Sequence, residues 1–576
     1  MTEVSYFHQP LTNPMEHRTL VQLLESRAIE HPDKEAIVIY NESRKRSSLT
    51  FGEYQTQSRA LAASLIEKGL GHGDRVAIMS PNKLEYVISM MACLRIGANV
   101  INIVQGLSSD DIAEILTALK CNALICFVDE DPTISKVASI AIHDIFTIHK
   151  PKEHLPHFRE VITIGSLVEC ERSRDHIHLY SELLSTGHTL EKENLTKSEK
   201  EVQFDDDAFL LLTSGSDGVP KAVQYTHQGL VISSITSGQI MKATSDSRIY
   251  NDSPFTWPSG ICCGLGLAPS FGSTIISIPP VTTVRDRSMK FFLSVLENEK
   301  CTNASLIPYH LFDIVAEGTS LRQYNLKHFQ YAVIGGQPVP KALVNRMLSL
   351  LPNVKLNLYY ATTEFMIIAE QLIHKKNIHT TQYGWMTLQP GVETKIVNEE
   401  GHILPVGSIG EVHVRGPMLF AEYLENPYAT RKSLSATGWF NSSEMGEMNN
   451  KGEIKIYGHK GDAINRAADV LYPVEWEKVM VQHPLVAQVK IIGVPDPRLY
   501  EEMCACVVLK EHNDLESKRA MLEDWYNLQW PRNEDGLSWK PGYTIFLKSF
   551  PMTRTNSPDR RELRKLALLK LGLKEQ

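Results

Sequence analysis

The sequence predicts an α/β protein built on doubly wound parallel sheets. Short apolar runs of strand length, such as residues 35–40 and 75–79, alternate with longer segments of helical periodicity such as residues 50–69. The chain has 576 residues, which is enough for several compact units, and 43% of them are hydrophobic, which supports large cores. These observations favour a large globular protein over a disordered or fibrous chain.

The first 130 residues show the alternation most clearly. Helices and strands are expected in turn at residues 17–31, 35–40, 50–69, 75–79, 85–97 and 122–128. Residues 170–206 are polar and charged and contain few aromatic side chains, so we expect a linker or a surface excursion there.

Further strands are expected from Ala208 onward. They are the segments AFLLL, KAVQY, STIISI, YAVIG and LNLYY. The alternating segments GVETKIV, GEVHVRG and GEIKIYG lie between glycine turns and predict a small β-rich subdomain. After GHKGD (458–462) a helix at 474–482, two strands and a charged helical end indicate a small α+β domain. We therefore expect a large domain over residues 1–461 and a small domain over residues 462–576.

Composition and the chain ends limit the partners and the location. Lys plus Arg number 59 and Asp plus Glu 67, and this net charge of −8 argues against nucleic acid as the main partner. The first residues lack the apolar core of a signal peptide and carry acid early, and no peroxisomal address ends the chain. Prolines and glycines interrupt the uncharged stretch 252–285, so a buried core segment is expected rather than an integral membrane span.

The nine cysteines form no CxxC pair, which favours buried, reduced thiols in an intracellular, cytoplasmic protein.

The segment TSGSDGVPK (213–221) is the strongest chemical signal in the chain. Backbone N–H groups can approach phosphate oxygens closely at glycines, hydroxyls add donors, and a lysine supplies positive charge. The segment is not a Walker loop, because a proline precedes its lysine and a strand follows. On spacing alone a flexible surface turn is the alternative to a loop that binds the phosphates of ATP. The residues concerned are Thr213, Ser214, Gly215, Ser216, Gly218 and Lys221.

Several motifs in order resemble those of the adenylate-forming superfamily, which includes acyl-CoA synthetases, peptide-synthetase adenylation domains and luciferases. TSGSDGVPKAVQYTH is similar to its phosphate loop, GGQ (335–337) to its adenine-contacting segment, and YATTE (360–364) to its YGxTE motif. GSIGEVHVRGP, YLENPYAT and GWFNSSEMGEMNNKGEIKIYGHKGD resemble the later stretches up to the hinge. The similarity runs from about Ser5 to the end of the chain, and SYFH, LYPVEWE and EEMCACVVLK are most similar to medium-chain acyl-CoA synthetases of the family-member-two type.

The resemblance implies a two-step reaction that uses ATP, Mg²⁺ and coenzyme A on a small-molecule carboxylic acid. It places Thr213, Lys221, Thr363 and Glu364 among the catalytic residues, with Thr363 donating to the α-phosphate and Glu364 binding the metal. The nucleotide contacts that it implies, besides the loop, are Gly335, Gly336, Gln337, Tyr360, Glu444 and His459. It also implies that the small domain is mobile and rotates about Asp462, and it makes a mitochondrial location the alternative to the cytoplasm.

The acyl substrate is expected to be a fatty or other apolar acid. Phe255, Trp257, Ile261 and the pair 365–366 suggest an apolar pocket, with Trp257 at the family's gate position, and no acidic residue stands out as a partner for an amino group.

The sequence departs from the family pattern at chemically demanding positions. Asp217 lies in the phosphate loop, where a carboxylate repels phosphate. Glu444 replaces the ribose-binding aspartate, and His459 replaces an arginine and so loses its bidentate fork. Ser557 stands where the family has a lysine that bridges the attacking carboxylate and the α-phosphate.

Smaller departures are Ala361, in place of the YGxTE glycine, and Ala467-Ala468, in place of two glycines near the thiol path. Three hypotheses follow. The chain is an active synthetase that uses a substitute cation, a degenerate relative that binds a nucleotide or an acyl group, or an adenylate-former with an acceptor other than coenzyme A.

Overall fold

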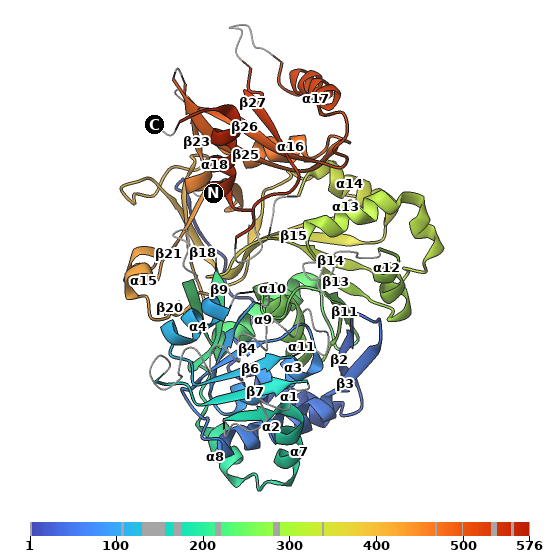
Figure 1. Cartoon of the computed structure of the whole chain (residues 1–576), viewed down its shortest axis with the longest axis vertical. Helices are drawn as coiled ribbons and strands as arrows, with labels where there is room; N and C mark the ends of the chain where they lie inside the picture. The colour runs from blue at the N-terminus through green and yellow to red at the C-terminus, as the bar shows by residue number, and fades with distance from the viewer. Residues whose placement is uncertain are drawn as a thin grey trace.

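The computed structural model describes residues 3–104, 107, 109–128, 156–165, 176–213, 221–279, 289–336, 339–466, 469–497, 499–531, 538–553 and 558–574. Within these residues the strands form four sheets, of eight, nine, five and five strands (Figure 1). The expected α/β class, with a β-rich part and a smaller α+β part at the carboxyl end, is confirmed.

The eight-stranded sheet has the order β20-β10-β9-β5-β4-β6-β7-β8. Its six strands from β9 to β8 are parallel, whereas β10 and β20 are antiparallel additions at one edge. The bounds are β4 Arg75–Met79, β5 Asn99–Asn102, β6 Ala123–Phe127, β7 Glu160–Ile164, β8 Ile177–Leu179, β9 Asp207–Thr213, β10 Lys221–Thr226 and β20 Glu422–Tyr423.

The nine-stranded sheet has the order β17-β16-β15-β14-β13-β11-β12-β2-β3. Its six central strands are parallel, and β3, β16 and β17 are antiparallel. The bounds are β2 Glu35–Tyr40, β3 Arg46–Thr50, β11 Arg248–Asn251, β12 Thr274–Ser277, β13 Asn303–Leu306, β14 Tyr331–Ile334, β15 Lys355–Thr362, β16 Met366–Ile373 and β17 Thr387–Leu388.

Helices cover both sheets. The expected early helices are α1 Leu20–Glu30, α2 Phe51–Glu67 and α3 Leu84–Arg95, and capping boxes at Thr19 and Thr50 begin the first two. Helix α9, His227–Met241, is buried along nearly its whole length because it packs between the two sheets. The other helices of this part are α4 Ser109–Ala118, α10 Pro258–Gly260, η1 Ile261–Leu265, α11 Leu267–Phe271, α12 Met289–Asn298, α13 Pro308–Glu317, η2 Gly318–Gln323, α14 Lys341–Leu350 and α15 Pro427–Ser433.

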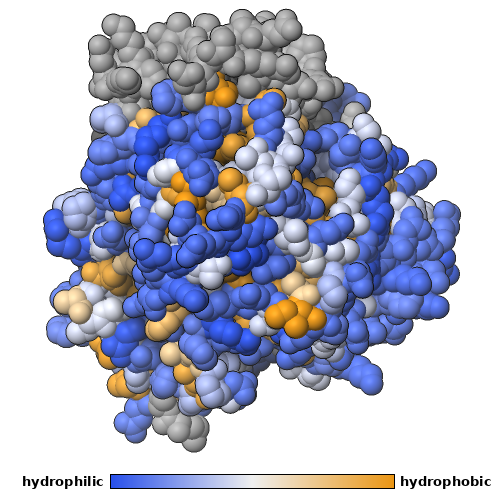
Figure 2. All heavy atoms as spheres, turned by 90° about the horizontal axis from the view of Figure 1, so that it is seen from below, coloured by the Kyte–Doolittle hydropathy of each residue, from blue (hydrophilic) through white to orange (hydrophobic). Residues whose placement is uncertain are grey.

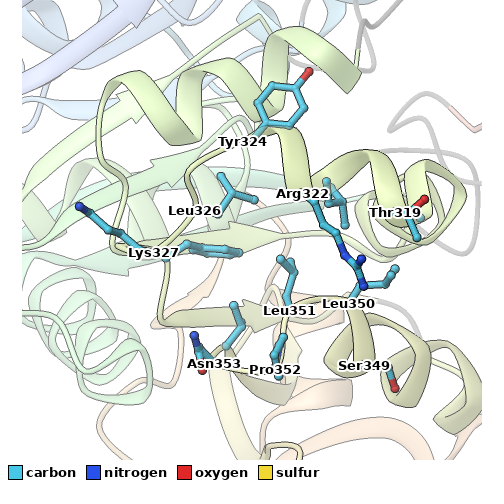
Figure 3. Close-up of a pocket in the computed structure, with 14 residues that line it drawn as sticks. Thr319, Arg322, Tyr324, Leu326, Lys327, Ser349, Leu350, Leu351, Pro352 and Asn353 are labelled. Carbon is cyan, nitrogen blue, oxygen red and sulfur yellow. The ribbon is translucent and has the colours of Figure 1, made fainter.

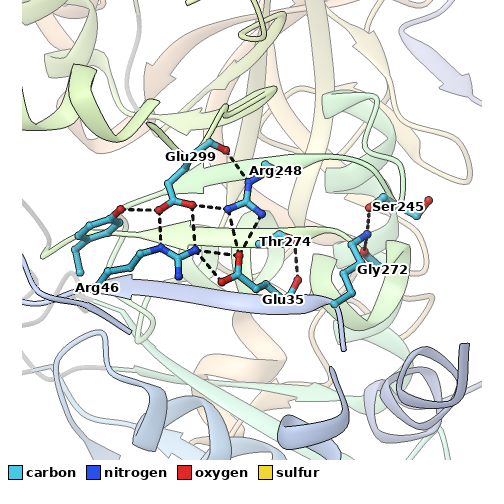
Figure 4. A network of polar contacts seen from close by, with 9 residues as sticks. Glu35, Arg46, Ser245, Arg248, Gly272, Thr274 and Glu299 are labelled. Carbon is cyan, nitrogen blue, oxygen red and sulfur yellow. Dashed lines mark hydrogen bonds and ion pairs between the residues drawn. The ribbon is translucent and has the colours of Figure 1, made fainter. Parts of the chain in front are cut away.

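An ion network holds the edge strand β3 to the nine-stranded sheet (Figure 4). Arg46 of β3 donates to Glu299 at 2.8 Å and to Glu35 at 2.8 and 2.9 Å. Arg248 of β11 pairs with both carboxylates, and the Tyr40 hydroxyl donates to Glu299 at 2.5 Å. Because each charge has more than one partner, the network joins β2, β3 and β11 at the surface.

Of the remaining two sheets, one is antiparallel and the other is mixed. The β-rich sheet has the order β1-β18-β19-β21-β22 and contains the three alternating segments that the sequence indicates. Its bounds are β1 Tyr6–His8, β18 Glu393–Val397, β19 Gly410–Arg415, β21 Phe440–Met448 and β22 Ile454–His459, after which η3 spans Lys460–Asp462.

The last sheet and its apolar clusters consist only of residues that follow Asp462. Its elements are β23 Ile464–Arg466, β24 Asp469–Leu471, α16 Val474–Met480, β25 Val486–Asp496, β26 Tyr500–Leu509, α17 Leu515–Gln529, β27 Tyr543–Leu547 and α18 Arg560–Leu571.

The expectation of a linker at residues 170–206 is wrong over its described part. Residues 176–201 contain β8 and two helices, α7 Tyr180–Thr189 and α8 Glu193–Glu201, which pack on α2. Gly187 allows a close approach, since a Cβ there would lie 1.9 Å from the Ala60 carbonyl oxygen. The segment is polar because α7 and α8 form an outer layer of the protein and bury few apolar residues. Its Glu199 forms ion pairs with arginines of α2 and α3 beneath it.

Two further expectations, that the uncharged stretch 252–285 and the cysteines are buried, are confirmed in the described part of the chain. Residues 252–279 contain α10, η1, α11 and β12, and most of them are buried. Among the described residues no helix has the length and apolar character needed to cross a membrane. The eight described cysteines are buried. On the face shown in Figure 2, apolar side chains gather in small groups between hydrophilic ones.

A buried arginine makes α8 important for stability. The Arg95 side chain is 0% exposed, and its guanidinium donates to Glu199 of α8 at 2.7 Å. We expect Glu199→Ala to lower the free energy of unfolding by about 3 kcal/mol, because it leaves a buried charge uncompensated. Urea denaturation followed by circular dichroism measures this change. Glu201→Ala, on the exposed side of the same helix, is the matched control, and equal stability of the two variants would contradict the prediction.

Candidate active site

The ends of the predicted phosphate loop face each other across a hairpin. Thr213 ends β9 and Lys221 begins β10, and the two residues are direct partners in the antiparallel register. Both side chains are partly buried. The loop between them, with Ser214, Gly215, Ser216, Asp217 and Gly218, lies outside the described residues. The structure thus places the two ends of the loop side by side at the edge of the eight-stranded sheet.

The turn that carries Thr363 and Glu364 joins β15 to β16 and is held from three sides. The Thr362 hydroxyl accepts from the Phe365 amide at 3.1 Å. The hydroxyl of Tyr225, on β10, donates to the Thr363 carbonyl at 2.8 Å. The Phe420 amide donates to the Glu364 carbonyl at 2.9 Å. The backbone of this turn is therefore fixed by the hairpin that carries Lys221 and by the segment before β20.

Tyr423 of β20 connects Lys221 to Glu364. Its hydroxyl donates to Oε1 of Glu364 at 2.7 Å, and the Lys221 ammonium lies 5.0 Å from the centre of its ring. Burial raises the pKa of the Glu364 carboxyl, while the Tyr423 hydroxyl and the Lys221 charge act in the opposite direction. A buried carboxylate and a cation thus share one aromatic side chain beside the loop ends.

Glycines and a tyrosine lie at the carboxyl ends of β14 and β15, which are neighbours in the sheet. A Cβ on Gly335 would lie 2.4 Å from the Tyr359 ring, so the close approach requires glycine, and Gly336 has a φ of +82°. The Tyr360 hydroxyl is buried. Gln337 falls outside those residues. Burial raises the pKa of Tyr360, and the charges of Glu444 and Glu364 add to the effect, so Tyr360 lies within reach of both carboxylates.

Glu444 and His459 are direct partners across β21 and β22. Ser443 adopts a φ of +56°, and the Asn441 side chain stabilises this turn by accepting from the Ser443 amide at 2.8 Å. Burial, helped by the charge of Asp462, raises the pKa of Glu444 to about 7. The exposed His459 ring accepts from the Gly461 amide at 3.0 Å. Glu444 is thus a buried carboxyl close to Asp462, whereas the exposed His459 ring binds its own turn.

Arg560, whose role the sequence left open, is fully engaged. It contacts Asp462 at 2.9 Å and Glu477 at 2.8 Å, and it donates to the Ile491 carbonyl at 2.6 Å. The alanine pair 467–468 and residues 554–557, which include Ser557, lie outside the described residues.

Four of the expected acyl-pocket residues are buried in the largest apolar core. Phe255, Ile261, Phe365 and Met366 belong to the same buried apolar cluster. Trp257 is only partly buried and precedes α10.

A surface cavity of about 240 Å³ lies elsewhere (Figure 3). Phe329 and Val354, which precede β14 and β15, contribute to its wall, together with Arg322 and the end of α14. The cavity is therefore at the amino ends of the strands whose carboxyl ends carry Gly335 and Tyr360, and it is not part of this site.

Glu364 is the residue that suits a metal ion here. Across the described ranges, no group of three or more His, Cys, Asp or Glu side chains is placed to hold a metal. A single carboxylate fits Mg²⁺, because this ion keeps several waters and takes further oxygen ligands from phosphates. The donor set is thus compatible with a metal that arrives with a nucleotide.

Sequence reasoning assigned no role to Tyr423 or Tyr225. Tyr423 is 59 residues from Glu364 along the chain, and this contact leaves no spacing pattern in the sequence. The only sequence signal for Tyr423 is its place at the start of YLENPYAT, one of the motifs that carry the resemblance.

Two protein-family models match the chain. The model described as AMP-binding enzyme matches residues 24–424, and that described as AMP-binding enzyme C-terminal domain matches residues 475–556. The mitochondrial medium-chain acyl-CoA ligase ACSF2 of Danio rerio is 24% identical over 583 residues, which cover 99% of this chain and 91% of that protein. The medium-chain fatty-acid–CoA ligase of Escherichia coli (strain K12) is 26% identical over 485 residues, covering 83% and 79%.

Solved structures share the fold. The anthranilate CoA ligase AuaEII, in complex with anthranoyl-AMP, superposes with a TM-score of 0.79 at 19% identity, covering 97% of this chain and 99% of that one. The Mycobacterium tuberculosis fatty acyl CoA synthetase gives a TM-score of 0.68 at 21% identity, covering 96% and 99%.

The raised pKa of Glu444 predicts a pH-dependent stability. Because the folded chain holds this proton up to about pH 7, whereas the ordinary value is 4.5, stability is lost as the pH rises between these values. Glu444→Gln should remove this loss and stabilise the protein by up to about 3 kcal/mol above pH 7. Thermal unfolding across this pH range measures the effect. The exposed Glu422→Gln is the control, and parallel pH profiles for Glu444→Gln and the unaltered chain would refute the prediction.

Proposed function

The chain belongs to the AMP-binding enzyme family, and from this we propose that it is an AMP-forming acid–thiol ligase of the acyl-CoA synthetase type. It activates a fatty or other apolar carboxylic acid with ATP to give acyl-AMP, and it transfers the acyl group to coenzyme A. The observation that carries the proposal is the position of Lys221 and Glu364 on either side of Tyr423, beside the ends of the phosphate loop.

In the first step the acid's carboxylate attacks the α-phosphorus of ATP and pyrophosphate leaves. Lys221 and the loop from Thr213 to Gly218 bind the phosphates, where positive charge and N–H donors stabilise the transition state. The Thr363 hydroxyl donates to the α-phosphate, and its backbone is already fixed by Tyr225. Mg²⁺, held by Glu364 and phosphate oxygens, would neutralise charge that develops on the leaving group.

The adenosine lies along the carboxyl ends of β14 and β15. Gly335 and Gly336 let the backbone approach the adenine, Gln337 continues this segment, and Tyr360 stacks on the ring. Glu444 accepts from the ribose hydroxyls, and a carboxyl with a pKa of about 7 retains an accepting oxygen when it is protonated. His459, the last residue of β22, lies opposite Glu444 in the sheet.

For the second step we propose that residues 462–576 move as a small domain against residues 1–461. Asp462 is tied through Arg560 to the small domain, so the change in backbone angles falls on residues 460–461. The coenzyme A thiol would then attack the acyl carbonyl and release AMP.

The apolar cluster around Phe255 and Phe365 supports a fatty or aryl acid as the substrate. We propose a cytoplasmic location, with the mitochondrion as the alternative because the ACSF2 relatives are named mitochondrial.

A second candidate function is supported by Ser557. A serine supplies no positive charge at the α-phosphate, and Arg560 is engaged by Asp462 and Glu477. These two facts favour a family member that binds a nucleotide or an acyl ligand without efficient adenylation. An adenylate-former with an acceptor other than coenzyme A is the third possibility, and product analysis separates the three.

A pyrophosphate-release assay with medium-chain fatty acids, with and without coenzyme A, tests the synthetase directly. We expect release with at least one acid and a thioester product when coenzyme A is present. Glu364→Gln should lower the rate on the order of 10²-fold, because it removes a charged ligand at the phosphates. Glu422→Gln, an exposed glutamate beside Tyr423, should leave the rate unchanged.

The other outcomes of this assay are equally informative. ATP binding without pyrophosphate release from any acid would favour the binding-protein function. AMP formation without thioester would favour an acceptor other than coenzyme A.

The lysine position yields a separate prediction. Ser557→Lys should raise the rate of adenylation by roughly tenfold or more, since one preorganised donor typically contributes on the order of 10²–10³ in rate. Ser557→Gln, which adds length without charge, is the control. An unchanged rate in Ser557→Lys would mean that the missing lysine does not limit the reaction. Stopped-flow or discontinuous measurement of acyl-AMP formation gives the rate.

A further inference from the structure

Tyr423 is rigidly placed between the elements of the site. It lies on β20 opposite Val223 of β10, and it is 2% exposed. Its amide donates to the Thr430 hydroxyl at 3.0 Å, and its ring packs against Phe420 with centres 4.8 Å apart. The side chain therefore has its backbone, its ring and its hydroxyl all fixed by neighbours.

Two contacts of Tyr423 involve the residues proposed to bind the phosphates and the metal. The hydrogen bond of 2.7 Å to Oε1 of Glu364 fixes the plane of that carboxylate, and so the direction of its other oxygen. The ring lies under the Lys221 ammonium at 5.0 Å, a distance at which a cation is attracted to the aromatic face. One side chain thus contacts a carboxylate on the turn between β15 and β16 and a cation at the start of β10.

We propose that Tyr423 is a positioning residue that sets the metal-binding geometry of Glu364 through its hydroxyl and fixes the position of the Lys221 ammonium through its ring. This proposal rests on the proposed function of the site. Carboxylates that bind metals are in turn hydrogen-bonded, and loss of such a partner typically weakens metal affinity roughly 10- to 100-fold. The two effects come from different atoms of Tyr423, so they can be separated by substitution.

Two variants separate the hydroxyl from the ring. Tyr423→Phe keeps the ring, with its contacts to Lys221 and Phe420, and removes only the donor to Glu364. Tyr423→Leu removes both. Tyr40→Phe is the matched control, because the Tyr40 hydroxyl also donates to a glutamate, Glu299, in the remote network of Figure 4.

The experiment measures binding as well as turnover. Mn²⁺ affinity in the presence of ATP is followed by electron paramagnetic resonance, and ATP affinity in EDTA is followed by calorimetry. Tyr423→Phe should weaken Mn²⁺ binding about 10- to 100-fold and leave metal-free ATP binding unchanged. Tyr423→Leu should weaken both, and Tyr40→Phe neither.

Wild-type Mn²⁺ affinity in Tyr423→Phe overturns the proposal. Equal losses of Mn²⁺ and metal-free ATP binding in that variant, with a lower melting temperature, also overturn it, because they indicate a merely structural residue. If the unaltered chain binds neither Mn²⁺ nor ATP, the proposed function itself fails, and the proposal fails with it.

Discussion

The pairing of β20 with β10 brings three distant segments of the chain to one point. Strand β10 supplies Lys221 and Tyr225, and β20 supplies Tyr423. The turn after β15 lies between them, held at the Thr363 carbonyl by Tyr225 and at the Glu364 carboxylate by Tyr423. Without this short antiparallel addition the carboxylate would lose its donor and the lysine its aromatic partner. The rest of the two large sheets holds these three segments in position.

Residues from both large sheets meet at this point because of the direction of the parallel strands. Parallel strands collect their carboxyl ends along one edge, and ligands in such folds bind outside those ends. Gly335 and Tyr360 follow this rule in the nine-stranded sheet, and Thr213 follows it in the eight-stranded one. Helix α9 contacts strands of both sheets and is buried on all sides, so it fixes the distance between the two sets of residues. The residues proposed to bind the phosphates and those proposed to bind the adenine are thus joined through a common core.

Sequence periodicity predicted the elements whose own residue pattern determines their structure. Residues 35–40 and 75–79 match β2 and β4 because a buried parallel strand needs an uninterrupted apolar run. Helices α7 and α8 escaped prediction because their stability comes from contacts with α2 and from the pair of Glu199 with Arg95, 104 residues away. The contacts of Tyr423 were not predicted either, because its partner Glu364 is distant from it in the sequence. The nucleotide and metal roles came from ordered motifs, since neither periodicity nor composition distinguishes Glu364 from any other glutamate.

The ion pairs around Asp462 and Glu477 limit what Arg560 can do at the proposed site. Glu477 is 8% exposed and depends on Arg560 and on Lys490, which contacts it at 2.9 Å. Withdrawing Arg560 from Glu477 would leave this buried carboxylate with Lys490 as its one remaining cation among the described residues, which lowers stability. Arg560 is therefore a poor substitute for the charge absent at Ser557. Under the proposed function, Lys221 and a cation bound at Glu364 would have to supply that charge, and Tyr423 contacts both of these side chains.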